Sequence, residues 1–78
     1  MNDQRRQSAL RILARELSIA QESLTPDKTL REDLGMDSIV ALNLIFASEK
    51  ELGVTIREEE IVLVRTVGDL EELLSRQP

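Results

Sequence analysis

The chain has 78 residues, a net charge of −5, and neither cysteine nor histidine. A chain of this length is near the lower size limit for folding without a staple, so we expect a single domain over residues 1–78. The missing residue types exclude disulfides and the usual zinc sites. The acidic balance argues against nucleic acid as a partner.

The apolar residues are almost entirely aliphatic, because Phe46 is the only aromatic residue. A small aliphatic chain with few glycines is typical of a helical bundle. No apolar run approaches the roughly 20 residues that span a bilayer, and the first residues lack the apolar region of a signal peptide. We therefore expect a cytoplasmic monomer that does not bind membranes.

The first expected element is a helix over residues 3–19. Its apolar residues recur at the i, i+3, i+4 and i+7 positions of one helix face: Leu10, Leu13, Ala14 and Leu17. The long connection "AQESLTPDKTLREDLGM" follows, in which Pro26 and its neighbours are typical of a turn. A turn of helix is expected near residues 30–34. Three leucines are expected to hold this connection against the core: Leu24, Leu30 and Leu34.

The strongest helical signal covers residues 37–52, with Gly53 as its stop. The segment "VTIREEEI" predicts a short extended piece and then a short helix near residues 58–62. Thr66, with Asp69 three residues later, resembles a capping box and begins a last helix. The expected fold is all-α, a four-helix bundle of three main helices and one short helix, with a long loop between the first two main helices.

The helix over residues 37–52 carries two apolar stripes when it is drawn at about 100° per residue. One stripe is expected to face the core: Ala41, Leu44, Ile45, Ser48 and Leu52. The other lies on the far side of the helix: Ile39, Leu42 and Phe46. Since a small domain cannot easily bury both, either the long connection covers the second stripe or the stripe is exposed for a partner. We favour the second interpretation.

Ser38 stands at the start of this helix, directly after Asp37, which is a good N-cap. A phosphoryl group on its hydroxyl would meet the unpaired N–H groups and the positive end of the helix dipole. Catalysis by this serine would need a base, and nothing places Lys28 or Lys50 in that role. We expect no metal site, since Asp33 and Asp37 are more simply a solvated pair. Ser38 therefore predicts a modification site in a protein that is not an enzyme.

The segment "LREDLGMDSIVALNLIFASEKELGVTI", followed by "EEEI" and "TVGDL", resembles the acyl carrier proteins over residues 30–74. The most specific motif is "DLGMDSI". What the resemblance implies is a four-helix bundle whose serine, here Ser38, receives 4′-phosphopantetheine from coenzyme A. A separate phosphopantetheinyl transferase would attach this arm and recognise Asp37. The thiol of the arm would then carry acyl or aminoacyl cargo as a thioester.

Charge along the chain is uneven. Residues 1–31 carry six basic and four acidic side chains (net +2). Residues 32–78 carry four basic and eleven acidic side chains (net −7). A partner that docks near Ser38 is therefore expected to be basic. The resemblance implies acyl-activating, synthase or acyltransferase enzymes as such partners. We expect them to contact one helix: Ile39, Leu42, Asn43, Phe46, Glu49 and Glu51.

Several residues depart from the pattern of the family. Val40 and Asn43 stand where acidic residues are common, and Arg57 replaces the usual proline. Ser48 is polar on the core stripe, where a bond back to the carbonyl of Leu44 would satisfy its hydroxyl. These departures favour a specialised carrier over the housekeeping one of fatty-acid synthesis.

The leading hypothesis is an acyl carrier protein for fatty-acid, polyketide or related biosynthesis. Two alternatives stay open: an aminoacyl or peptidyl carrier, and a helical protein–protein adaptor that is never modified. Nothing in these residues names the cargo.

Overall fold

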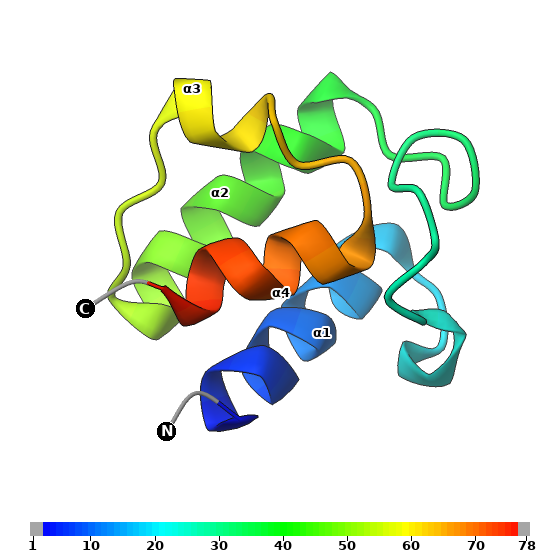
Figure 1. Cartoon of the computed structure of the whole chain (residues 1–78), viewed down its shortest axis with the longest axis horizontal. Helices are drawn as coiled ribbons and strands as arrows, with labels where there is room; N and C mark the ends of the chain where they lie inside the picture. Colours follow the sequence, from blue (N-terminus) through cyan, green and yellow to red (C-terminus); the bar gives the residue numbers. More distant parts are fainter. Residues whose placement is uncertain (1–2, 77–78) are drawn as a thin grey trace.

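The computed structural model describes residues 3–76, and its elements are helical. In chain order they are α1 (Asp3–Leu17), the 3₁₀ helix η1 (Gln21–Ser23), α2 (Ser38–Leu52), α3 (Glu58–Ile61) and α4 (Val67–Ser75), as Figure 1 shows. Within residues 3–76 there is no β-strand, and the one isolated bridge joins Thr29 and Thr66. The predicted all-α bundle of three main helices and one short helix is confirmed.

The core lies where α1 packs against both α2 and α4. The largest fully buried apolar side chains come from these three helices and from the loop before α2: Ile12, Leu13, Leu30, Leu44, Val67, Leu70 and Leu74. In Figure 1 the short α3 lies above α2, and a loop joins it to the start of α4. No helix within residues 3–76 is long and apolar enough to cross a membrane.

The two ends of α2 are set by local chemistry that the sequence predicts. Asp37 caps the start, with its Oδ1 accepting a hydrogen bond from the N–H of Val40 at 2.8 Å. Gly53 follows the last residue with a φ of 67°, a left-handed conformation that glycine adopts without strain. Its N–H donates to the carbonyl of Glu49. The predicted start and stop of this helix are confirmed.

The start of α4 contains the predicted capping box. Thr66 Oγ1 accepts a hydrogen bond from the N–H of Asp69 at 3.1 Å, and Asp69 Oδ2 accepts one from the N–H of Thr66 at 3.2 Å. The short α3 has a similar start, because Glu60 Oε1 accepts from the N–H of Arg57 at 3.1 Å. These side chains satisfy the N–H groups that the first turn of a helix leaves unpaired.

The long connection is held in place by backbone hydrogen bonds to the start of α4. The N–H of Leu30 donates to the carbonyl of Arg65 at 2.8 Å, and the N–H of Gly68 donates to the carbonyl of Pro26 at 3.0 Å. A Cβ at Gly68 would lie 3.2 Å from that carbonyl oxygen, a tight contact that would push the two segments slightly apart, so the close approach favours glycine. Leu24 and Leu30 are buried, as predicted, and Leu34 packs against the core.

Two details differ from the predictions. The first helix ends at Leu17 and not at residue 19, because Ser18 adopts a left-handed φ of 57° that turns the chain away. The connection contains η1, which was not predicted from the sequence. Residues 30–34, where a turn of helix was predicted, form hydrogen-bonded turns that are not part of a helix.

Acid is expected to destabilise this fold through the carboxylates that cap its turns. Hydrogen bonds from the N–H groups of Arg65 and Thr66 hold the pKa of Asp69 below its usual value, and a bond from the N–H of Thr29 does the same for Asp33. A carboxyl whose pKa is lower in the folded state stabilises the fold above its unfolded pKa, and this contribution is lost as pH falls through the folded pKa. We expect the Tm to fall once the pH drops below about 4.

Thermal unfolding followed by circular dichroism at a series of pH values measures this loss. The control is Asp69→Asn, whose side chain does not titrate. Its Tm should be lower at neutral pH and should fall less on acidification. A Tm that does not change between neutral pH and about pH 2 would contradict the assigned role of these carboxylates.

Candidate functional site

Ser38 is the first residue of α2, and it is exposed. Its Oγ has no hydrogen-bond partner within residues 3–76. The side chain that caps α2, by accepting a bond from the N–H of Val40, is that of Asp37. The N-cap is a role that serine often fills, and here the neighbouring aspartate has taken it. The hydroxyl of Ser38 is therefore left free on the surface.

The surroundings of this hydroxyl favour a negative group. The first N–H groups of a helix lack partners in a preceding turn, and they form the positive end of the helix dipole. Asp37 adds one negative charge beside Ser38, and its carboxylate already accepts the bond from Val40. A singly charged group on Ser38 suits this balance better than a doubly charged one.

A groove with a volume of about 980 Å³ includes Ser38 in its lining. Its walls come from the loop before α2, from α2, and from the segment that contains α3. The apolar part of the lining includes Met36, Ile45, Ile56 and Ile61. An apolar chain attached to Ser38 would find water-excluding side chains directly beside its point of attachment.

The second stripe of α2 is exposed and not covered by the long connection. Ile39, Leu42 and Phe46 keep 71%, 50% and 59% of their surface in contact with solvent. Leu44 and Ser48 of the core stripe are fully buried. Ala41 and Ile45 of that stripe are only half-buried, because they line the groove.

The predicted acidic contacts of α2 have partners inside the molecule. Glu49 is half-buried, and its Oε2 accepts a hydrogen bond from the N–H of Ile56 at 3.0 Å. Glu51 forms ion pairs with Arg11, at 3.5 Å, and with Arg15 of α1. The hydrogen bond from Arg15 lowers the pKa of Glu51. Asn43 is exposed on α2, and its role in docking stays a prediction, as does that of both glutamates.

Ser48 contradicts one expectation. Its hydroxyl is fully buried and has no hydrogen-bond partner within the described part of the chain, so the predicted bond back to the carbonyl of Leu44 is absent. The helical wheel placed this residue correctly in the core, but the proposed partner was wrong. The buried oxygen therefore carries a desolvation cost.

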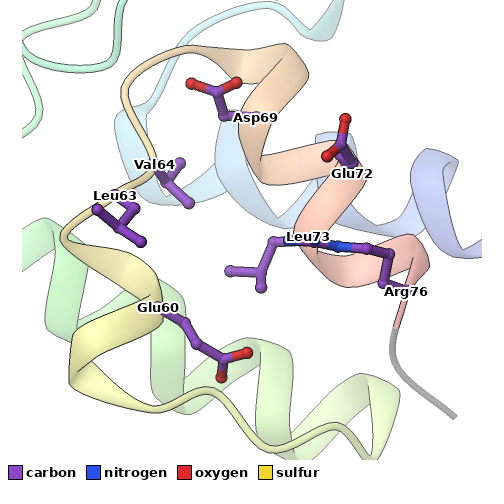
Figure 2. A pocket seen from close by; sticks show the side chains of 7 residues that line it. All are labelled: Glu60, Leu63, Val64, Asp69, Glu72, Leu73 and Arg76. Carbon is purple, nitrogen blue, oxygen red and sulfur yellow. The ribbon is translucent and has the colours of Figure 1, made fainter.

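A smaller cavity of about 190 Å³ lies between α3 and α4. Figure 2 shows its side chains, with Leu63 and Val64 after α3 and Leu73 on α4. Two of its carboxylates, Glu60 and Asp69, already cap the two helices. Ser38 does not line this cavity. Residues 3–76 also contain no group of three acidic, cysteine or histidine side chains that could hold a metal ion.

The fold and the exposed serine together define a small helical bundle with a free hydroxyl at the start of α2. The family model described as phosphopantetheine attachment site matches residues 7–74. The chain belongs to the acyl carrier protein family. Members of this family are not catalytic themselves and work with partner enzymes.

Individual relatives agree with this assignment. The chain is 39% identical over 69 residues to the acyl carrier protein MbtL of Mycolicibacterium paratuberculosis, which covers 88% of this chain and 78% of that protein. It is 36% identical over 66 residues to the acyl carrier protein of Thermosynechococcus vestitus, and the match covers 85% of this chain and 82% of that protein. A solved chain of a candidate acyl carrier protein from Mycobacterium tuberculosis has a TM-score of 0.78 at 27% identity, with 86% of this chain and 89% of that chain covered.

The structure brings four of the eight predicted site residues together in one groove. Ser38, Leu42, Phe46 and Glu49 line the same groove, whereas Glu51 lies against α1. The apolar residues that reach the groove from outside α2, such as Ile56 and Ile61, were not predicted from the sequence. The signal for them was Gly53, since a left-handed residue after α2 turns the chain back along that helix.

Proposed function

We propose that this chain is an acyl carrier protein that carries acyl intermediates as thioesters on a 4′-phosphopantetheine arm attached to Ser38. It would serve fatty-acid, polyketide or related biosynthesis in the cytoplasm. The observation that supports this most is the exposed, unpartnered Oγ of Ser38 at the N-terminus of α2, inside the motif "DLGMDSI". Coenzyme A would donate the arm through a phosphopantetheinyl transferase.

The residues around Ser38 fit this prosthetic group. A phosphodiester carries one negative charge, which the first turn of α2 can accept next to the already bonded carboxylate of Asp37. When bound, the group supplies the thiol that a chain without cysteine lacks. The chain itself holds the attachment point on the rigid start of a capped helix and offers an apolar groove beside it.

Asp37 has two tasks in this proposal. Its side chain fixes the start of α2 and so positions the hydroxyl of Ser38, and its exposed carboxylate is available for recognition by the transferase. The later partners would be acyl-activating, synthase or acyltransferase enzymes. Each of them must approach the same end of α2, because their common substrate is tethered there.

The test is the intact mass of the protein after co-expression with a broad-specificity phosphopantetheinyl transferase. We expect the mass to rise by that of one phosphopantetheine group and to stay unchanged for Ser38→Ala. Ser23→Ala, an exposed serine on η1, is the matched control and should still be modified.

The mass measurement also separates the alternatives. If several transferases leave the mass unchanged, the unmodified adaptor becomes the better interpretation. If the arm is attached but the protein isolated from its native cell carries an aminoacyl or peptidyl group, the cargo class proposed here is wrong while the attachment at Ser38 stands.

A further inference from the structure

We propose that Arg31 and Arg65 bind the phosphodiester of the arm attached to Ser38, and that this contact holds the start of the arm over the groove. The inference rests on the proposed function and adds two residues to its binding site. Neither arginine lies on α2, because Arg31 belongs to the loop before that helix and Arg65 to the segment between α3 and α4. Both side chains are exposed, and both line the groove that includes Ser38.

Backbone hydrogen bonds bring these segments together at Leu30, which is buried. The N–H of Leu30 donates to the carbonyl of Arg65 at 2.8 Å, and its carbonyl accepts a hydrogen bond from the N–H of Met36 at 2.8 Å. Arg31 follows Leu30 in the chain, and Ser38 comes two residues after Met36. The fold thus gathers two arginines and the attachment point around one buried residue.

Two carboxylates fix the backbone that carries the arginines. Asp33 Oδ2 accepts a hydrogen bond from the N–H of Thr29 at 2.8 Å, and Asp69 Oδ2 accepts one from the N–H of Arg65 at 3.1 Å. The bridge between Thr29 and Thr66 joins the two segments directly. A ligand is positioned well by side chains whose backbone is held in this way.

The guanidinium groups of Arg31 and Arg65 have no partner in the part of the chain that the structure describes. Neither forms a hydrogen bond or an ion pair within residues 3–76, whereas Arg11, Arg15 and Arg57 each pair with a carboxylate. Carboxylates are plentiful in a chain with a net charge of −5. Two unpaired arginines on one groove therefore indicate an added anion, and a planar guanidinium group binds phosphate oxygens through two parallel hydrogen bonds.

The arginines also offset negative charges that stand near the attachment point. Asp37 is next to Ser38 in the chain, and the exposed Glu32 is next to Arg31. Both carboxylates would repel a phosphodiester on Ser38. Two guanidinium groups on the same groove balance these two charges, so that the phosphodiester meets hydrogen-bond donors where the arm begins.

The other acidic residues that line the groove, Glu49 and Glu58, lie farther from Ser38. Glu49 is eleven residues beyond Ser38, which corresponds to about 16 Å along α2. Its carboxylate accepts a hydrogen bond from the N–H of Ile56, and Glu58 follows Ile56 by two residues. The groove thus has its cations near the attachment point, which favours an anion at the start of the arm over one at its far end.

NMR of the unmodified and the arm-bearing wild-type chain tests this contact. We expect the Nε–H signals of Arg31 and Arg65 to shift when a phosphopantetheinyl transferase attaches the arm, because hydrogen bonds to phosphate change the surroundings of a guanidinium group. The signal of Arg76, which is exposed and lines the cavity between α3 and α4, is the matched control and should not shift. Raising the salt from about 50 mM to about 500 mM should return both signals toward their positions in the unmodified chain.

Substitution measures what each arginine contributes. The phosphorus-31 signal of the arm is broad when the phosphodiester is held and narrow when the arm moves freely. We expect Arg31→Gln and Arg65→Gln each to lower the ratio of held to free arm by about two- to fivefold, the usual effect of an exposed charge pair. The double variant should free the arm, and Arg76→Gln should leave the signal unchanged. Intact mass shows that each variant has taken up the arm.

The outcomes separate the inference from the proposed function. If the arm is attached but the signals of Arg31 and Arg65 stay in place, or the phosphorus signal is as narrow in the wild type as in the double variant, the contact is refuted and the carrier role stands. If the two arginines respond only when the arm carries a carboxylated group such as glutaryl, and not with the uncharged pentanoyl group, they bind cargo and the inference is also refuted. If no transferase modifies the wild-type chain, both fall together.

Discussion

Replacing Leu44 with alanine is expected to destabilise the protein by about 2–5 kcal/mol, because the side chain is fully buried and its loss leaves a cavity. A domain of 78 residues has a total stability of only about 4–12 kcal/mol. The variant should therefore lose a large share of its free energy of unfolding and be partly unfolded at physiological temperature. Urea denaturation followed by far-ultraviolet circular dichroism measures the difference.

The matched control is Leu42→Ala, the same substitution two positions earlier on the same helix. Leu42 is half-exposed at the groove, so its truncation should change the free energy of unfolding by less than about 1 kcal/mol. Equal losses in the two variants would mean that both stripes of α2 are buried in solution. The interpretation of the second stripe of α2 as a docking surface would then be wrong.

The fold could be predicted from the sequence where its signals are local. The starts of α2 and α4 depend on a side chain that bonds a backbone N–H three residues away, at Asp37 and Thr66, and both were predicted correctly. The stop at Gly53 is local in the same way. The end of α1 was placed too late, since the apolar pattern continues through Ile19, which packs on the core after the helix has ended.

Contacts between distant residues could not be predicted in this way. The ion pairs of Glu51 join residues 36 and 40 positions apart, and no local pattern indicates them. The helical wheel nevertheless contained a warning, because Glu49 and Glu51 differ by about 200° around α2. The two carboxylates could therefore not both lie beside the second stripe of α2. Rotation around the helix decides which side of α2 each carboxylate occupies, and the role of both glutamates in docking stays a prediction.

For Ser48, too, the sequence predicted burial but not the hydrogen-bond partner of the side chain. Its position on the wheel predicted burial, which the structure confirms, since burial follows from periodicity. Whether a buried hydroxyl finds an acceptor depends on its rotamer and on the neighbouring helices. Periodicity contains no information about either, and the proposed bond to Leu44 was wrong for that reason.

Ser48→Ala is expected to stabilise the protein by about 1–3 kcal/mol, since it removes a buried hydroxyl that has no partner within the described residues. For a domain of this size the Tm should rise by about 4–8 °C per kcal/mol. Ser75→Ala is the control, because Ser75 is also buried in a helix but its Oγ donates to the carbonyl of Glu72 at 2.9 Å. Both substitutions replace a buried helical serine with alanine, and a larger rise in Tm for Ser48→Ala than for Ser75→Ala would report the missing partner. A Tm of Ser48→Ala below that of the wild type would show that the hydroxyl is hydrogen-bonded in solution.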